Sequence, residues 1–562
     1  MKAIFSNLAE NSDRNAHLLP IAEVAAKLGV PLDALEFHGR HAAKLPLDLI
    51  DPAKVAAGNL VLVSAVTPTP KGEGKTTISI GLTDALNRLG HRTVAVLRQP
   101  SLGPVFGRKG GASGGGQAQI VPWELINLHL TGDFNAVEKA HNLLAAMIDN
   151  NVQNRRNTLG IDPRTVAWKR VLDMNDRALR HIVVGLGGRS HGVPRETGFD
   201  ITAASEVMAA LCLSENLSHL REKLGGIFVG HTHDRRPIFA RDLKAHGAMA
   251  ALLHEAIRPN LVQTRGGSAA ILHGGPFANI AQGTNSILAT RMGLTFGEFA
   301  VTEAGFGFDL GGEKFFNLKC GYGKLSPRVV VLVATVRALK YHGGAALADL
   351  GNSNLPALEK GFANLARHIQ SVRVFGREPV VAVNQFTTDT PEELQRVVSL
   401  CADHGVSAAV ANVWKSGGAG AEDLAALVAR AAAAGGTPHR PLYDWNWGVE
   451  RKIEAIARNI YGADGIELLP GARASLQRIA DLGCDKLPIC MAKTQNSLSD
   501  NPALLGRPEG FVIRVREIEI AAGAGFLVPI TGDIVRMPGL PEIPAAEHLD
   551  VDAQGRVTGW EG

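Results

Sequence analysis

The chain has 562 residues, of which 45% are hydrophobic, 20% charged and 5% aromatic, and its formal net charge is +4. This length and composition can bury a large core in more than one domain, which excludes a mainly disordered, fibrous or coiled-coil protein. The basic residues are scattered and aromatic residues are few, which argues against nucleic-acid binding. Apolar runs such as Val329–Ala334 are too short to span a bilayer.

The N-terminal residues MKAIFSNLAENSDRN lack the apolar core of a secretory signal. The five cysteines are odd in number and include no CxxC pair, which does not fit a disulfide framework. We therefore expect a cytoplasmic protein with reduced thiols.

Short β-branched runs alternate with amphipathic, alanine-rich stretches along the chain. Continuous apolar strands between helices are typical of a parallel sheet covered on both faces. The pattern therefore predicts an α/β fold, with a P-loop-type, mainly parallel sheet, helices on both faces and two smaller α/β domains. Strands are expected at 59–66, 91–97, 181–186, 226–229, 329–333, 379–383 and 408–413. Helices are expected at 75–89, 203–213, 241–257, 355–369, 391–402 and 422–433.

Two stretches rich in glycine, asparagine or proline are the best linker candidates, LADLGNSNLP before Leu358 and AGGTPHRP at 434–441. They divide the chain into a large nucleotide-binding domain at 1–355 and two smaller domains at 356–450 and 451–562. After Phe511 the segment VIRVREIEI alternates apolar and charged residues, which predicts a half-exposed strand.

The segment TPTPKGEGKTT at 67–77 follows a predicted strand and opens a predicted helix. Successive backbone N–H groups in such a loop form an anion-binding site at a helix N-terminus. Lys75 would reach the outer phosphates of a nucleotide and Thr76 could ligate Mg²⁺. Thr69 stands where a Walker A loop has its first glycine, so the alternative is a Gly- and Pro-rich turn with a solvated lysine.

A second glycine-rich segment, RQPSLGPVFGRKGGASGGG at 98–116, follows the next predicted strand. Glycines let the backbone approach a ligand closely, and Arg98 stands at a strand's carboxyl end, where α/β sheets bind ligands. A guanidinium group suits bidentate contact with a carboxylate or phosphate. We interpret the two loops as a site for two anions, a nucleotide and an acidic co-substrate; the alternative for the second loop is a flexible surface loop.

These segments resemble those of formate–tetrahydrofolate ligases, also called formyltetrahydrofolate synthetases. TPTPKGEGKTT resembles the nucleotide loop of that family, RQPSLGPVFGRKGGASGGG its first signature, and VATVRALKYHGG at 333–344 its second. Further stretches that fit include NLHLTGDFNAV at 127–137, VTEAGFGFDLGGEKFF at 301–316 and LPICMAKTQNSLSD at 487–500. The similarity extends from about residue 15 to the end of the chain.

The resemblance implies a two-step reaction. Formate would attack the γ-phosphate of ATP, giving formyl phosphate and ADP, and N10 of tetrahydrofolate would then displace phosphate, giving 10-formyltetrahydrofolate. By similarity, Arg98 would hold formyl phosphate and Lys75 the transferring phosphoryl group, while Asp133 is a candidate for Mg²⁺ or proton handling. The nucleotide loop would comprise Thr69, Pro70, Lys71, Gly72, Glu73, Gly74, Lys75, Thr76 and Thr77.

The resemblance also implies how the folate is bound and how the chain assembles. Phe386 and Trp414 each follow a predicted strand, where aromatic residues are more often simply core. They match the family's two aromatic residues that sandwich the pteridine, which makes 356–450 the folate-contacting domain. A homotetramer activated by K⁺ or NH₄⁺ is implied, acting on small molecules without nucleic-acid or membrane partners.

Several residues depart from the usual pattern of the family and change its local charge. The departures within or near the motifs include Gln99, Arg108, Gln117, Gln282 and Gln385. Two alternatives therefore stand beside the ligase, a divergent paralogue that uses another small carboxylate or acceptor and a non-catalytic nucleotide-binding relative. The presence of Lys75, Arg98, Phe386 and Trp414 argues against the second. Glu303, in VTEAGFG, either takes part in catalysis or caps a turn.

Overall fold

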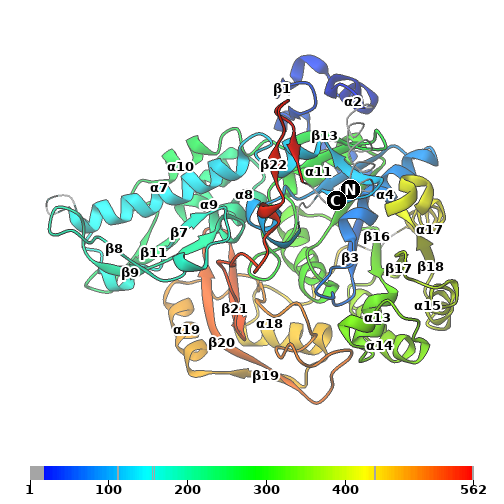
Figure 1. Ribbon diagram of the computed structural model, residues 1–562. Helices are drawn as coiled ribbons and strands as arrows, with labels where there is room; N and C mark the ends of the chain where they lie inside the picture. The colour runs from blue at the N-terminus through cyan, green and yellow to red at the C-terminus, as the bar shows by residue number, and fades with distance from the viewer. Residues whose placement is uncertain (1–17, 110–112, 155, 157, 436–437, 560–562) are drawn as a thin grey trace.

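The computed structural model describes residues 18–109, 113–154, 156, 158–435 and 438–559 (Figure 1). A 12-stranded sheet forms its centre, in the order β1-β2-β13-β14-β4-β15-β3-β16-β17-β18, with β6 beside β13 and β5 beside β6. From β14 to β18 along this order all neighbouring strands are parallel. The strands are β1 Glu36–Phe37, β2 Ala43–Lys44, β3 Asn59–Ala65, β4 Thr93–Leu97, β5 Gly114–Gly115, β6 Ala118–Val121, β13 Asn260–Thr264, β14 Ala269–Leu272, β15 Phe299–Glu303, β16 Val329–Ala334, β17 Pro379–Asn384 and β18 Ala408–Ala411.

Both faces of this sheet are buried, as its continuous apolar strands require. In β3, Leu60 and Leu62 belong to one core cluster, whereas Val61 and Val63 belong to another on the opposite face. Helices α4 (Lys75–Arg88) and α17 (Glu422–Ala433) cover the second face, and α11 (Ile287–Phe296), α13 (Val336–His342), α14 (Leu355–Val374) and α15 (Pro391–Asp403) cover the first. The predicted α/β class, with a mainly parallel sheet and helices on both faces, is confirmed.

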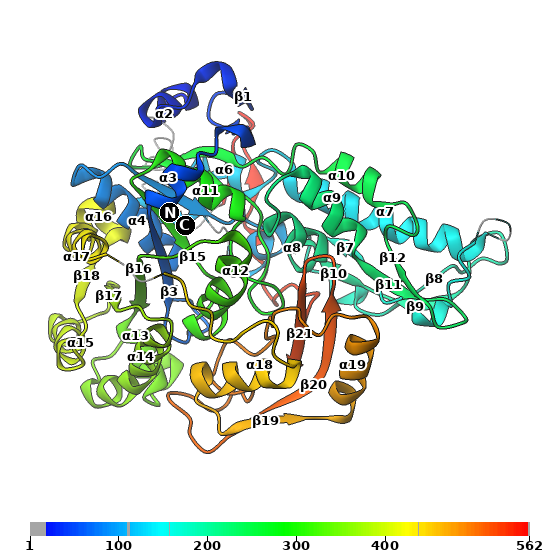
Figure 2. The same cartoon turned by 180° about the vertical axis from the view of Figure 1, so that it is seen from behind.

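Two further groups of elements flank the sheet, as Figure 2 shows from behind. One contains helices α7 (Asp133–Gln153), α8 (Glu206–Cys212), α9 (Leu217–Gly225) and α10 (His246–Leu252). The other contains α18 (Val449–Ile456), α19 (Pro470–Asp481) and a three-stranded sheet, β19 (Gly465–Leu468), β20 (Val512–Ala521) and β21 (Phe526–Thr531). The predicted half-exposed strand after Phe511 is β20, whose first four residues alternate exposed and buried.

Some predicted elements were placed or bounded wrongly. The runs 181–186 and 226–229 were predicted in the buried sheet but form β8 (Ile182–Val184) and β11 (Phe228–His231), each paired antiparallel in a two-stranded sheet. Short apolar runs alone do not say which sheet a strand joins. The helix predicted at 241–257 is shorter in the structure, where only α10 (His246–Leu252) is helical. Lys244 adopts φ 56°, which prevents the helix from starting before His246.

The division into three domains stays a prediction, and part of its second linker, 436–437, lies outside the described residues. β16 and β17, on either side of its first boundary, are paired neighbours in one sheet. Within the described part of the chain, no helix combines the length and apolarity needed to cross a membrane.

Candidate active site

Apart from Asp133, the predicted site residues follow strands of the central sheet and lie along the edge where its parallel strands end. The phosphate loop follows β3, Arg98 follows β4, and Glu303 is the last residue of β15, the strand between them. Phe386 and Trp414 follow β17 and β18, which pair at Asn384 and Ala411. Ligands of open α/β sheets bind at this edge.

The phosphate loop turns sharply into α4. Gly74 precedes the helix with φ 75°, and an added Cβ there would lie 2.4 Å from Nδ2 of Asn384. The same Asn384 amide donates to the carbonyl of Glu73 at 2.9 Å. Glycine is therefore required at position 74 for both its backbone angle and its contact with β17.

Glu73 holds the loop from inside. Glu73 is 2% exposed, and its Oε1 accepts a hydrogen bond from the backbone N–H of Thr69 at 2.6 Å. Oε2 accepts one from the hydroxyl of Thr335, the residue that caps α13. Thr69, which stands in place of the first glycine of a Walker A loop, is thus fixed through its backbone. The predicted nucleotide-binding Glu73 turns its carboxylate into the protein.

Glu303 joins the two anion-binding segments. The Thr76 hydroxyl donates to its Oε2 at 2.8 Å, and the Arg98 guanidinium lies 3.4 Å from its Oε1. The Glu303 side chain is only 5% exposed. Thr76 and Arg98 therefore share the Glu303 carboxylate. Thr76 lies in the first turn of α4, directly after Lys75. Of the two roles predicted for Glu303, these contacts favour the catalytic one.

Arg98 keeps donor capacity for a ligand. Its Nη1 lies 3.4 Å from the carbonyl of Pro276, and its buried Nε makes no hydrogen bond with a described residue. Such a buried donor needs a partner. A bound anion at this edge would supply one, as predicted for a formyl phosphate site.

The second glycine-rich segment is anchored where it leaves Arg98. Asp173 accepts hydrogen bonds from the Ser101 hydroxyl at 2.6 Å and the Leu102 amide at 2.9 Å. Burial raises the pKa of Asp173 to about 6. The start of this segment is therefore packed rather than a flexible surface loop; 110–112 and the side chain of Arg108 lie outside the described residues.

Asp133 begins α7 and is held by other residues. Its Oδ1 accepts from Nζ of Lys44 at 2.6 Å and its Oδ2 from the amide of Asn260 at 2.7 Å. It makes no hydrogen bond or ion pair with Thr76, Arg98 or Glu303, so these contacts do not bring it into their group. Its part in Mg²⁺ or proton handling stays a prediction.

Phe386 and Trp414 border the loops from the neighbouring strands. The Arg337 guanidinium stacks on the Phe386 ring, 3.6 Å from its centroid, and this arginine also lies 3.4 Å from the carbonyl of Gly72. Trp414 is 52% exposed. Its backbone carbonyl accepts a hydrogen bond from the backbone N–H of Gln117 at 2.8 Å. An added Cβ at Gly116 would lie 2.1 Å from that carbonyl. Both rings are thus placed beside the phosphate-binding edge.

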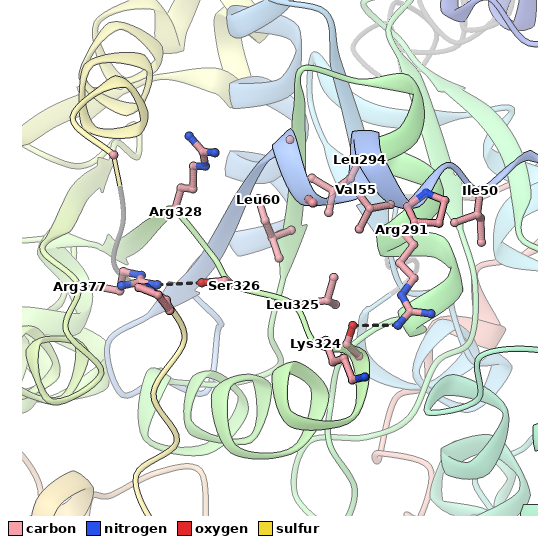
Figure 3. A pocket seen from close by; sticks show the side chains of 16 residues that line it. Ile50, Val55, Leu60, Arg291, Leu294, Lys324, Leu325, Ser326, Arg328 and Arg377 are labelled. Atoms are coloured by element: carbon pink, nitrogen blue, oxygen red, sulfur yellow. Dashed lines mark hydrogen bonds between the residues drawn. The ribbon is translucent and has the colours of Figure 1, made fainter.

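A cavity of about 810 Å³ lies at the opposite edge of the sheet, near the starts of β3 and β16 (Figure 3). Its Arg291 pairs with Glu215 at 2.7 Å, and its Arg377 donates to Ser326 at 2.9 Å. None of the predicted site residues lines it. This cavity is therefore separate from the active-site edge.

A family model described as formate–tetrahydrofolate ligase matches residues 9–561. The chain belongs to the formate–tetrahydrofolate ligase family. A formate–tetrahydrofolate ligase of Syntrophus aciditrophicus (strain SB) is 55% identical to it over 543 residues, 96% of each chain. One of Methylobacterium sp. (strain 4-46) is 54% identical over 555 residues, 97% of this chain and 98% of that one.

Several residues that support the loops of this formate–tetrahydrofolate ligase family member were not predicted from its sequence. Thr335, Arg337 and Asn384 contact the phosphate loop or its aromatic neighbour, yet they lie at least 250 residues from it in the chain. Their signal was their position, because all three stand at or just after the carboxyl ends of β16 and β17.

Proposed function

We propose that the protein ligates formate to tetrahydrofolate with ATP, giving 10-formyltetrahydrofolate, ADP and phosphate by way of formyl phosphate. A formate oxygen attacks the γ-phosphorus, and the bond from that phosphorus to ADP breaks. N10 of tetrahydrofolate then attacks the formyl carbon, loses its proton and expels phosphate. The single observation that carries the proposal is the Glu303 carboxylate, which contacts both Thr76 of the nucleotide loop and Arg98.

The first step joins two anions, so it needs positive charge at the reacting phosphoryl group. Lys75 supplies that charge from the nucleotide loop, and Arg98 supplies it from the next strand. Arg98 orients formate and then formyl phosphate through its guanidinium N–H groups. Glu303 positions that guanidinium and keeps it beside α4.

The residues also fit a Mg²⁺ ion bound with the nucleotide. The Thr76 hydroxyl and Glu303 carboxylate, 2.8 Å apart, are the oxygen ligands that Mg²⁺ prefers, directly or through water. The ion neutralises phosphate charge when bound. Asp133 is the other candidate for metal or proton handling, with its carboxylate engaged by Lys44 and Asn260. Glu303→Gln should raise the Mg²⁺ concentration needed for half-maximal turnover, and an unchanged titration would contradict this role.

Phe386 and Trp414 bind the pteridine between their rings. Arg337 covers one face of Phe386, which orients that ring next to the nucleotide loop. A flat heterocycle gains stacking energy from such rings. The pteridine is then held within reach of formyl phosphate.

The decisive experiment is a coupled assay of ATP, formate and tetrahydrofolate, with and without K⁺, that follows ADP and the formylated product. We expect product only with all three substrates, and near-complete loss in Lys75→Ala without a change in melting temperature. Lys360→Ala, an exposed lysine on α14, is the matched control and should keep full activity. ADP release with another carboxylate in place of formate would indicate the paralogue, and nucleotide binding without turnover would indicate the non-catalytic relative.

We extend the proposal to a cytoplasmic homotetramer activated by K⁺ or NH₄⁺. The family membership supports this extension. Sedimentation at several protein concentrations measures the assembly, and the K⁺ arm of the assay measures the activation. A monomer would overturn the proposed homotetramer. Turnover independent of monovalent cations would overturn the proposed activation.

A further inference from the structure

Thr67, the first residue of the phosphate loop, is held at each of its polar groups by side chains of two helices. Its backbone N–H donates to Oδ1 of Asn364 at 3.2 Å, and its hydroxyl accepts from Nδ2 of the same amide at 2.9 Å. Its carbonyl accepts from Nε2 of His342 at 2.8 Å. His342 is the last residue of α13, and Asn364 lies within α14. Residues outside the loop therefore fix the point at which the chain enters it.

The same two side chains also hold Gly506, which belongs to the C-terminal part of the chain. Its backbone N–H donates to Nδ1 of His342 at 3.1 Å, and its carbonyl accepts from Nδ2 of Asn364 at 2.8 Å. Thr67, His342 and Asn364 are all buried. We call these four residues the clamp, because two side chains join the start of the phosphate loop to Gly506.

The partners of His342 determine which of its ring nitrogens carries the proton. The Thr67 carbonyl can only accept, so Nε2 must be protonated, and the Gly506 N–H can only donate, so Nδ1 must not be. Burial lowers the pKa of His342, which favours this neutral ring. Each nitrogen therefore serves one side of the clamp, and neither contact can be made without the ring between them.

The segment that carries Gly506 is itself firmly anchored. It follows the motif at 487–500, to which the proposed reaction assigns no role. Within that motif, the fully buried Lys493 lies 3.1 Å from the carboxylate of Asp309 and donates to the carbonyl of Ser497. The motif thus folds around one buried lysine, which gives the segment a fixed position next to α13 and α14.

Glycine is required at position 506. Its φ is 72°, and an added Cβ would lie 2.8 Å from the carbonyl oxygen of His342. A side chain there would push the segment away from α13 and break its contacts with the clamp. Gly510, four residues further along the same segment, has a similar φ of 68°, but an added Cβ there would meet no atom of the described residues within 4 Å.

We propose that His342 and Asn364 are positioning residues for ATP, which hold the phosphate loop in its binding shape through their contacts with Gly506. The proposal rests on the proposed function, because it takes the loop at 67–77 as the ATP site. Opening the clamp frees the entry of this loop, so its N–H groups converge less well on the phosphates. Tetrahydrofolate binding stays nearly unchanged, since its two rings follow β17 and β18.

The test measures the dissociation constant of ATP by calorimetry on the full chain, with Mg²⁺ and without formate or tetrahydrofolate. Gly506→Ala should weaken ATP binding about five- to tenfold. The matched control is Gly510→Ala, which also replaces a glycine of positive φ but touches no part of the clamp, and it should keep the wild-type constant. The dissociation constant of tetrahydrofolate should stay within about twofold in both variants.

Variants of His342 test the connection itself. His342→Phe keeps a ring but makes neither hydrogen bond, so it should weaken ATP binding about as much as Gly506→Ala. His342→Gln, whose amide can still donate to the Thr67 carbonyl, should recover part of the loss. Gly506→Ala added to His342→Phe should cause little further loss, because both changes break the same connection.

An unchanged ATP constant in Gly506→Ala, or losses that add fully in the double variant, would overturn the proposal. Equal weakening of ATP and tetrahydrofolate binding would also overturn it, because it would show a general effect on the fold. Calorimetry needs no turnover, so the result is separate from that of the ligation assay. A protein whose clamp variants lose ATP affinity, but whose wild type forms no formylated product, would keep the clamp and lose the proposed function.

Discussion

Oε2 of Glu73 accepts a hydrogen bond from the hydroxyl of Thr335 at 2.5 Å, although 262 residues separate the two in the chain. The other oxygen of the same carboxylate accepts from the Thr69 amide. One buried side chain therefore couples the shape of the phosphate loop to the start of α13. A hydrogen bond to a buried charged group contributes about 1.5–3 kcal/mol.

Glu73→Ala should lower kcat/KM for ATP by roughly ten- to a hundredfold, because the loop loses its internal anchor. Glu73→Gln, which keeps one acceptor oxygen, should lose less. Steady-state kinetics with ATP varied measure the effect. Thr335→Ser should retain wild-type KM for ATP, whereas Thr335→Val should raise it; equal KM values in Ser and Val variants would contradict the coupling.

Trp414→Leu should raise KM for tetrahydrofolate about tenfold by removing one stacking partner, while KM for ATP stays within twofold. Trp414→Phe should recover part of the loss. Kinetics with each substrate varied in turn separate the two constants. A rise in both KM values together would mean that Trp414 supports the loops rather than the folate.

Lys340→Met should destabilise the fold by about 3–5 kcal/mol, because it leaves the Glu393 carboxylate buried without its cation. Nζ of Lys340 lies 3.0 Å from Oε1 of Glu393, and both side chains are fully buried. Denaturant unfolding measures the change. Adding Glu393→Gln to Lys340→Met should restore part of the stability, since no charge then stays unpaired; a further loss in the double variant would count against this account.

Glu206 should make stability depend on pH. Its Oε1 accepts from the backbone amides of Gly523 and Ala524, and burial raises its pKa from 4.5 to about 7. Between these pH values the folded protein therefore binds more protons than the unfolded chain. The contribution of Glu206 to the free energy of unfolding thus falls as pH rises from about 4.5 to 7. Glu206→Gln should reduce the loss of unfolding free energy between pH 5 and pH 8 by up to about 3 kcal/mol.

Glu222→Gln, at an exposed glutamate on the neighbouring α9, is the control and should follow the wild-type curve. Urea unfolding at several pH values gives the curves. If the free energy of unfolding changed with pH equally in the wild type and in Glu206→Gln, Glu206 would not be the source of the pH dependence.

The sequence alone predicted the parts of the fold that local pattern controls. The uniform apolar runs of β3, β16 and β17 and the spacing in α15 and α17 were enough to place them within a few residues. β13, β15 and α7 were missed, because their short or mixed patterns become meaningful only beside their neighbours.

The site residues likewise include some that local sequence pattern predicted and one that it did not. The loop carrying Lys75 and the arginine at the end of β4 were found from motifs, whereas the role of Glu303 was left open. The order of strands, with β15 lying between β3 and β4, brings Glu303 into contact with both Thr76 and Arg98, and strand order is a long-range property that no motif contains.

The pairing of β16 with β17 also bears on how the chain is made. While the ribosome is still synthesising residues 335–378, the fully apolar strand Val329–Ala334 has one side without its neighbour. An unpaired strand edge of this kind invites association with other chains. Translation speed and chaperone supply over this interval should therefore affect the yield of folded protein.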